Sequence, residues 1–112
     1  MDVAMGIFEI TKKFLTEEKY SLTDQFRRSS RSVASNISEA WRKRRYPAAF
    51  VSKLNDAEGE AAETQTWTEV SLRCGYLTPD KARELDARCE EILSQLVAMV
   101  SRPEAWTINK DP

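Results

Sequence analysis

The sequence contains no histidine. Histidine is the commonest general base and metal ligand near neutral pH, so its absence removes the Ser-His, Cys-His and Glu-x-x-His arrangements of many hydrolases and di-metal bundles. No glycine-rich loop stands before a predicted helix either, which excludes phosphate-binding loops of the Walker and dinucleotide types. We therefore expect a protein that is not an enzyme and that has no catalytic residue, no metal site and no cofactor.

Glycine and proline are also scarce, with three and four among 112 residues. The commonest strong signals are helix formers such as Ala, Glu, Arg and Leu, and charged residues make up 31% of the chain. At this length a chain can bury one core without disulfide or metal support. The composition predicts a single all-α domain.

Long apolar runs and cysteine motifs are missing as well. A membrane span needs about 20 consecutive apolar residues, and Glu9, Lys12 and Lys13 interrupt the opening segment, where a signal peptide would be apolar. Cys74 and Cys89 form no Cys-x-x-Cys pair, and we interpret both as small buried hydrophobic residues. We expect a cytoplasmic protein with reduced thiols and no membrane partner.

Positive charge is concentrated in one segment. Residues 19–45 carry eight basic side chains against two acidic ones, whereas residues 1–18 and 46–112 are each net acidic, so the formal net charge is only −1. The chain therefore has one basic segment between two acidic ones.

Apolar residues recur at helical intervals in four consecutive blocks. Their spacing predicts helices over residues 2–15, 21–44, 47–74 and 79–101, followed by a C-terminal tail at 103–112. Residues 1–102 form one four-helix bundle in this interpretation. The predicted buried positions of the last three helices are Leu22, Phe26, Ser29 or Ser30, Val33, Ile37, Ala40, Phe50, Leu54, Ala57, Ala61, Thr68, Leu72, Ala82, Leu85, Cys89, Ile92, Leu96 and Met99. Leu93, Val97 and Val100 widen the stripe of the last helix.

Helix boundaries carry recognisable signals. Ser21 opens a sequence that resembles a capping box, and Pro47 suits the first turn of a helix. Gly75 stands where a left-handed C-terminal cap is expected, and Thr78 is placed to cap the last helix. The short connections predict an up-down-up-down antiparallel four-helix bundle. Because the second and third helices are longer than the first, apolar surface should stay uncovered in a monomer, which favours a homo-oligomer.

Several segments resemble the four helix bundle protein family, also called the 23S rRNA intervening-sequence protein family. The resemblance spans nearly the whole chain and is specific in the order and spacing of its motifs. The residues that carry it are TKKF at 11–14, YSLTDQFRRS at 20–29, SVASNISEAWR at 32–42, AEGEAAET at 57–64 and CGYL at 74–77.

The resemblance implies a bacterial protein that assembles as a homopentamer of four-helix subunits. One branch of the family, the accessory protein of diversity-generating retroelements, binds nucleic acid and a reverse transcriptase, whereas most members have no established role. Two residues depart from the family pattern: Ala40 replaces a glycine, and Glu60 replaces a serine after Gly59. The low net charge also differs from the strongly basic accessory branch.

Basic side chains gather on one face of the predicted second helix, away from its apolar stripe. At about 100° per residue, most of them project within roughly 60° of one another. Such a face can meet phosphates, and its binding would be steeply salt-dependent and largely independent of sequence. The candidate nucleic-acid-binding residues, for RNA or DNA, are Arg27, Arg28, Arg31, Arg42, Lys43 and Arg45. A solvated face that only aids solubility is the alternative.

An acidic strip follows the predicted third helix on the side away from Phe50 and Leu54. We interpret it as an oligomer interface that mates with the basic face of a neighbouring subunit, with a tryptophan as the apolar anchor. Its members are Asp56, Glu60, Glu63 and Trp67. Exposed helix charge is again the alternative.

Asn36 and Glu39 stand three residues apart beside the apolar stripe of the second helix. Buried polar groups there must be paired, so we expect both to have a structural role in fixing helix register. A ligand-binding role is the alternative.

Two functions remain open from the residues. The first is a non-catalytic, oligomeric binding or scaffold protein that contacts nucleic acid through its basic face. The second is a structural or protein-interaction module whose arginines are used in subunit contacts or bind a protein partner. Affinity for nucleic acid at low salt would separate the two.

Overall fold

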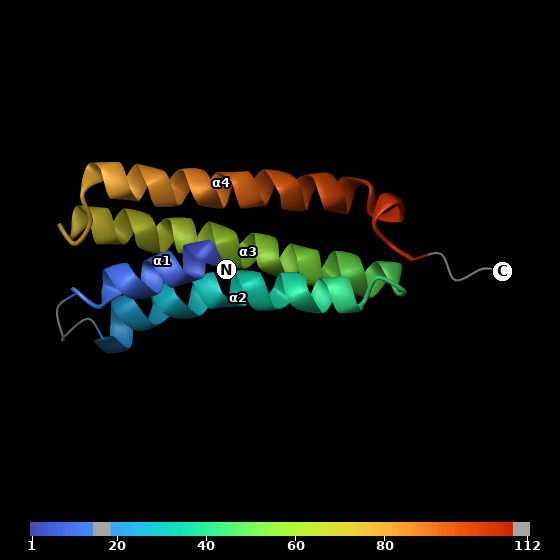
Figure 1. The fold of residues 1–112 in the computed structure, drawn as a ribbon, viewed down its shortest axis with the longest axis horizontal. Coiled ribbons are helices and arrows are strands. Elements are labelled where there is room, and N and C mark those ends of the chain that lie inside the picture. Colours follow the sequence, from blue (N-terminus) through green and yellow to red (C-terminus); the bar gives the residue numbers. More distant parts are fainter. Residues whose placement is uncertain (15–18, 109–112) are drawn as a thin grey trace.

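Four α-helices make up most of the chain. The computed structural model describes residues 1–14 and 19–108, and these contain no strand (Figure 1). The helices are α1 (Asp2–Thr11), α2 (Asp24–Arg42), α3 (Pro47–Arg73) and α4 (Pro79–Ser101). The predicted all-α class is confirmed.

The helices form an antiparallel bundle in which α3 is central. It packs against α2 along one side and α4 along the other, while α1 lies on α2 and also contacts α4 (Figure 1). Each helix runs opposite to the one before it, as short connections require. The four-helix bundle predicted from the sequence is confirmed.

The ends of α3 and α4 follow the predicted local signals. Gly75 has a φ of +78°, and the backbone N–H of Tyr76 donates to the Ser71 carbonyl at 2.9 Å. This is the Schellman termination of α3, which glycine accommodates because it lacks a Cβ. The Thr78 hydroxyl accepts a hydrogen bond from the backbone N–H of Lys81 at 3.2 Å, so Thr78 caps α4 as predicted.

The first helix ends earlier than the predicted range 2–15. After Thr11 the N–H of Phe14 donates to the Thr11 carbonyl, three residues back, which tightens the helix into a turn. Phe14 then packs against Phe26 and Tyr76, with ring centroids 6.4 and 5.0 Å apart. Its apolar side chain reaches the core from a turn, which the helical spacing alone did not distinguish from one more helical turn. The last residue of the predicted helix lies outside the described part of the chain.

The start of α2 also differs from the prediction. A π-helical turn, Lys19–Thr23, precedes α2, so helical backbone begins upstream of the proposed capping box. Ser21 lies inside this turn, and its interpretation as the start of the helix is wrong. The buried side chains of Leu22 and Thr23 hold the turn against the core. The predicted end at residue 44 is two residues beyond the observed end, Arg42.

The core consists of two apolar clusters, one toward each end of the bundle. They contain part of the apolar positions that the spacing predicted as buried, and further predicted positions are buried outside them: Leu22, Val33, Ala61 and Cys89. The first cluster consists of Ile7, Phe26, Leu77, Ala82 and Leu85. The second consists of Ala40, Phe50, Leu54, Ala57 and Leu96.

The two clusters differ in how many helices cover them. With 10 residues α1 is about 15 Å long, against about 40 Å for the 27 residues of α3. The N-terminus therefore lies near the middle of the bundle, and α1 covers only the first cluster (Figure 1). Around the second cluster Ile37, Ile92 and Met99 stay half-buried, and Val97 is 50% exposed.

The two cysteines occupy different environments. Cys89 is buried on α4, and burial raises the pKa of its thiol to about 11. Such a thiol stays protonated and unreactive at neutral pH, as predicted for a small core residue. Cys74 is exposed, because it lies at the end of α3 just before the Gly75 turn, so its prediction as buried is wrong.

Candidate nucleic-acid interface

The predicted basic face divides into two groups at opposite ends of α2. Arg27, Arg28 and Arg31 lie near its start, and Arg42 lies at its end with Lys43 and Arg45 just beyond. The 15 residues from Arg27 to Arg42 correspond to about 22 Å along the helix axis. The two groups have different surroundings, so they are described separately.

Two of the arginines near the start of α2, Arg27 and Arg31, contact α1. The Arg27 guanidinium lies 4.7 Å from the centroid of the Phe8 ring, and its Nε donates to the Thr11 hydroxyl at 2.7 Å. The Arg31 guanidinium lies 5.8 Å from the same ring. Cation–π contacts of this kind stabilise by about 0.5 to 2 kcal/mol, depending on exposure. The side chain of Arg27 therefore packs α1 against α2.

Arg28 is committed to α3. Its two terminal nitrogens lie 3.2 Å from the Glu60 carboxylate and 2.5 Å from that of Glu63, both on α3. The same Glu63 oxygen accepts a hydrogen bond from Trp67 Nε1 at 3.2 Å. The hydrogen bond from Arg28 is the main cause that lowers the pKa of Glu63. Arg28, a candidate for nucleic-acid binding, thus pairs within one chain with Glu60 and Glu63, two candidates for the oligomer interface.

The pairing of Arg28 with Glu63 gives a pH-dependent contribution to stability. A carboxyl group whose pKa is lowered by folding stabilises above its ordinary value of 4.5, and the contribution is lost as pH falls through the lowered value. Because both side chains are partly exposed, we expect a coupling energy of about 0.2 to 1 kcal/mol at pH 7. A double-mutant cycle of R28Q, E63Q and the double variant measures this coupling energy. Each protein is unfolded with urea at pH 7 and in strong acid. A coupling that is unchanged in acid would contradict this pairing.

The basic group at the end of α2 has fewer partners, although the charge of Lys43 contributes to lowering the pKa of Glu39. Arg42, Lys43 and Arg45 are exposed, and within the described part of the chain none of them forms an ion pair. The sequence prediction omitted Arg44, which lies between them. We call residues Arg42, Lys43, Arg44 and Arg45 the basic corner, because they lie where α2 passes into α3 (Figure 1).

Within the basic corner, the side chain of Arg44 contacts Trp41. Its guanidinium lies 3.8 Å from the centroid of the Trp41 ring, and its Nε donates to the Trp41 carbonyl at 3.0 Å. The spacing of three residues at a helix end is the signal that sequence reasoning could have used, because it places both side chains on one side of the chain.

The C-terminal segment folds back onto the basic corner. After α4 a short 3₁₀ turn, Pro103–Ala105, reverses the chain, and the N–H of Ile108 donates to the Arg44 carbonyl at 2.9 Å. Figure 1 shows this segment crossing the end of the bundle toward the start of α3. The predicted tail thus includes an ordered part that brings Trp106 to the same end of the molecule.

The acidic strip on α3 is only partly a free surface. Asp56 is exposed and lies 4.0 Å from Lys53 of its own helix, whereas Glu60 and Glu63 are paired with Arg28. Trp67 is half-buried and packs against the first core cluster. Charges that were predicted to pair between subunits therefore pair within one chain. Their role in an oligomer remains a prediction.

The two polar residues predicted to be structural both have side-chain partners. The side-chain amide of Asn36 donates to the Ser32 carbonyl of its own helix at 2.9 Å. Glu39 is exposed and pairs with Lys53 of α3 at 2.9 Å, and this hydrogen bond lowers the pKa of its carboxyl group. Glu39 thus links α2 to α3, although at the surface.

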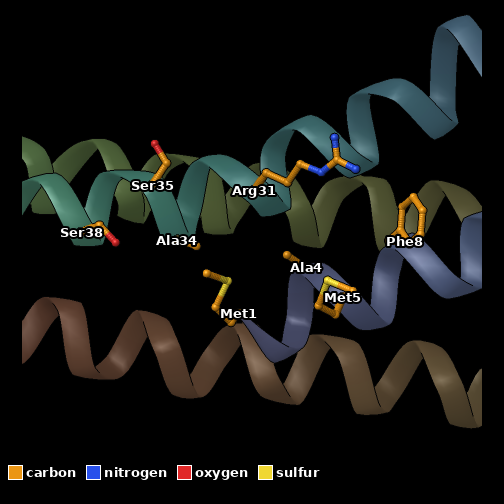
Figure 2. A pocket seen from close by; sticks show the side chains of 8 residues that line it. All are labelled: Met1, Ala4, Met5, Phe8, Arg31, Ala34, Ser35 and Ser38. Atoms are coloured by element: carbon orange, nitrogen blue, oxygen red, sulfur yellow. The ribbon is translucent and has the colours of Figure 1, made fainter.

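A groove runs between the start of α1 and α2. It encloses about 450 Å³, and its lining is mainly apolar. Figure 2 shows Met1, just before α1, opposite Ala34 of α2, while Met5 lies farther along α1 between Ala4 and Phe8.

The described part of the chain contains neither a candidate metal site nor a helix that could cross a membrane. No group of three or more Asp, Glu or Cys side chains within it is arranged to hold a metal ion. None of the described helices has the length and apolar character needed to cross a membrane.

The fold and its sequence define a known family of four-helix proteins. The model of the family described as 23S rRNA-intervening sequence protein matches residues 1–98. The chain belongs to this family. It is also similar to the crystal structure of a protein of unknown function from the S23 ribosomal protein family of Bacteroides thetaiotaomicron VPI-5482, with 31% identity, 89% of each chain covered and a TM-score of 0.81. None of the curated proteins matches the chain.

Proposed function

We propose that this protein is a non-catalytic, cytoplasmic binding protein that contacts RNA or DNA through the basic corner. The observation that carries the proposal is the contrast between the two basic groups on α2. Arg27 and Arg28 are engaged by side chains of α1 and α3, whereas four consecutive cations at the other end are without an ion pair among the described residues.

The chemistry of the basic corner favours phosphate over protein carboxylates as its partner. Four adjacent positive charges repel one another, and a polyanion relieves that repulsion while it releases condensed counterions. Backbone contacts of this kind carry no sequence information. Binding should therefore be largely independent of sequence and should weaken steeply with salt.

Titration with labelled nucleic acid tests the proposal. We expect the wild-type protein to bind a labelled oligonucleotide of either sugar type at low salt, and to lose most of that affinity at moderate salt. Fluorescence anisotropy at about 20 and 200 mM salt measures both, with scrambled sequences as a check on specificity. No affinity at the lower salt concentration would exclude nucleic-acid binding and leave the structural module as the function.

We also propose that the chain acts as a homo-oligomer, with the pentamer that the family resemblance implies as the expected size. The support is the uncovered half of the bundle, where the second cluster lacks the helix that α1 supplies to the first. The apolar groove at Met1 and Met5 and the exposed side chain of Val97 add further apolar surface outside the core. Surfaces of this kind are typical of protein interfaces.

The mass in solution tests self-association. Five chains of 12.8 kDa give about 64 kDa, which light scattering after size exclusion resolves from a monomer. Substitution V97D should shift the protein toward smaller species, because a charge would be buried at the interface. The matched variant A98D, on an exposed neighbouring position of α4, should keep the wild-type mass. A wild-type monomer at micromolar concentration would contradict the proposal.

A further inference from the structure

Exposed aromatic side chains gather around the basic corner. Trp41 is 48% exposed, Tyr46 58% and Trp106 43%. Elsewhere in the described residues the aromatic side chains are buried or half-buried. The exposed rings therefore concentrate at the end of the molecule that also carries the unpaired cations.

Contacts with Arg44 bring Trp41 and the segment that follows Trp106 to the same end of the bundle. The Arg44 guanidinium stacks on the Trp41 ring at 3.8 Å, and the Arg44 carbonyl accepts the hydrogen bond from Ile108, two residues after Trp106. Stacking fixes the plane of the Trp41 ring while nearly half of the side chain stays open to solvent. The rings belong to ordered elements, so little freedom remains to be lost when a ligand stacks on them.

Single exposed apolar residues are common on protein surfaces and need no explanation. The arrangement here differs because three large rings share one end of the bundle with four consecutive cations. Exposed rings beside cations match the two parts of a nucleotide, since a base offers a flat face and its phosphate offers a negative charge.

We propose that the basic corner is a platform for single-stranded nucleic acid, on which bases stack against Trp41 and Trp106 while Arg42, Lys43 and Arg45 hold the phosphates. This inference rests on the proposed nucleic-acid binding and specifies its substrate. Arg44 orients Trp41 and offers its own guanidinium plane for stacking.

The rings favour a single strand over a duplex for a geometric reason. In a duplex the faces of the bases are already stacked on their neighbours, so a surface ring can reach only the terminal pair. An unpaired strand can turn its bases out while its backbone follows the cations, as single-strand-binding surfaces require. Every base has a flat face, so this preference needs no sequence readout.

Binding of matched single strands and a hairpin duplex tests the inference. The probes are a labelled 12-nucleotide uridine RNA, the corresponding thymidine DNA and a hairpin of about 12 base pairs, titrated at the same low salt. We expect both single strands to bind more tightly than the hairpin. The two single-stranded arms show whether the sugar matters, which the stacking geometry alone does not decide.

Two substitutions of Trp41 separate stacking from packing. W41L keeps an apolar side chain without a ring and should weaken single-strand binding at least about fivefold, the lower end for one stacked base. W41F keeps a ring and should retain most of the affinity. Both variants should leave hairpin affinity and the mass in solution unchanged.

The possible failures are distinct. Equal binding of hairpin and single strands by the wild type, with no effect of W41L, would overturn the platform and leave the proposed function standing. A reduced mass of W41L and W41F would instead assign Trp41 to a subunit contact, which also overturns it. Absence of any binding by the wild type would remove the proposed function and this inference together.

Discussion

Replacement of Phe26 with alanine should lower the free energy of unfolding by about 3 to 5 kcal/mol. Phe26 is fully buried in the first core cluster, where residues of α1 and α4 surround it and Phe14 packs on its ring. A cavity there cannot be filled without moving three helices. Domains of this size are stable by only about 5 to 15 kcal/mol, so F26A should be unfolded or nearly so under mild conditions.

Urea unfolding followed by far-ultraviolet circular dichroism measures the loss. The matched control is Q95A, because Gln95 is exposed on α4 and its substitution should cost about 0.5 kcal/mol or less. Both variants must be compared with the wild type at one protein concentration, since self-association adds to apparent stability. A cost for F26A no larger than that of Q95A would show that the first cluster is not the core.

Removal of three charges from the basic corner should weaken single-strand binding about 100-fold at 0.1 M salt. The substitutions are R42Q, K43Q and R45Q in one variant, which leaves Arg44 and its stack on Trp41 in place. The estimate follows from counterion release, which contributes about 0.7 to the salt exponent for each phosphate contact on a single strand. Fluorescence anisotropy measures the affinity.

The control variant removes the same charge elsewhere. R73Q, R83Q and R88Q change exposed arginines of α3 and α4, each of which is paired with an acidic residue of its own helix. Loss of these surface pairs costs little stability. We expect the affinity of this variant to stay within about threefold of the wild type, which is a smaller change than the loss of one phosphate contact would cause. Equal losses in both variants would mean that net charge, and not the basic corner, governs binding.

Helix faces and most boundaries could be predicted because they depend on local physics. The range 79–101 for α4 is observed unchanged, since Thr78 caps one end and the apolar spacing is regular. The buried sides of α2 and α3 follow from period alone. The end of α1 was mispredicted because Phe14 is buried by tertiary packing with Phe26, which no local signal encodes.

The candidate interface could be predicted only in part. A helical wheel shows which cations share a face, but it does not show which partners the neighbouring helices bring to that face. Arg28 meets Glu60 and Glu63 from a segment more than 30 residues away, and Arg27 meets Phe8 across the α1–α2 contact. Arg44 was missed because its role depends on the ring beside it and not on its position in the wheel. We therefore place the proposed nucleic-acid contact at one end of α2, where no ion pair engages the basic side chains within the described residues.

The central claim is that phosphates bind at this end of α2, and the salt dependence of binding tests it most directly. We predict that a plot of log affinity against log salt concentration is steep for the wild type and flatter by about 2 for the corner variant, with the control variant parallel to the wild type. A corner variant with the wild-type slope would place the phosphate contacts elsewhere and contradict the claim.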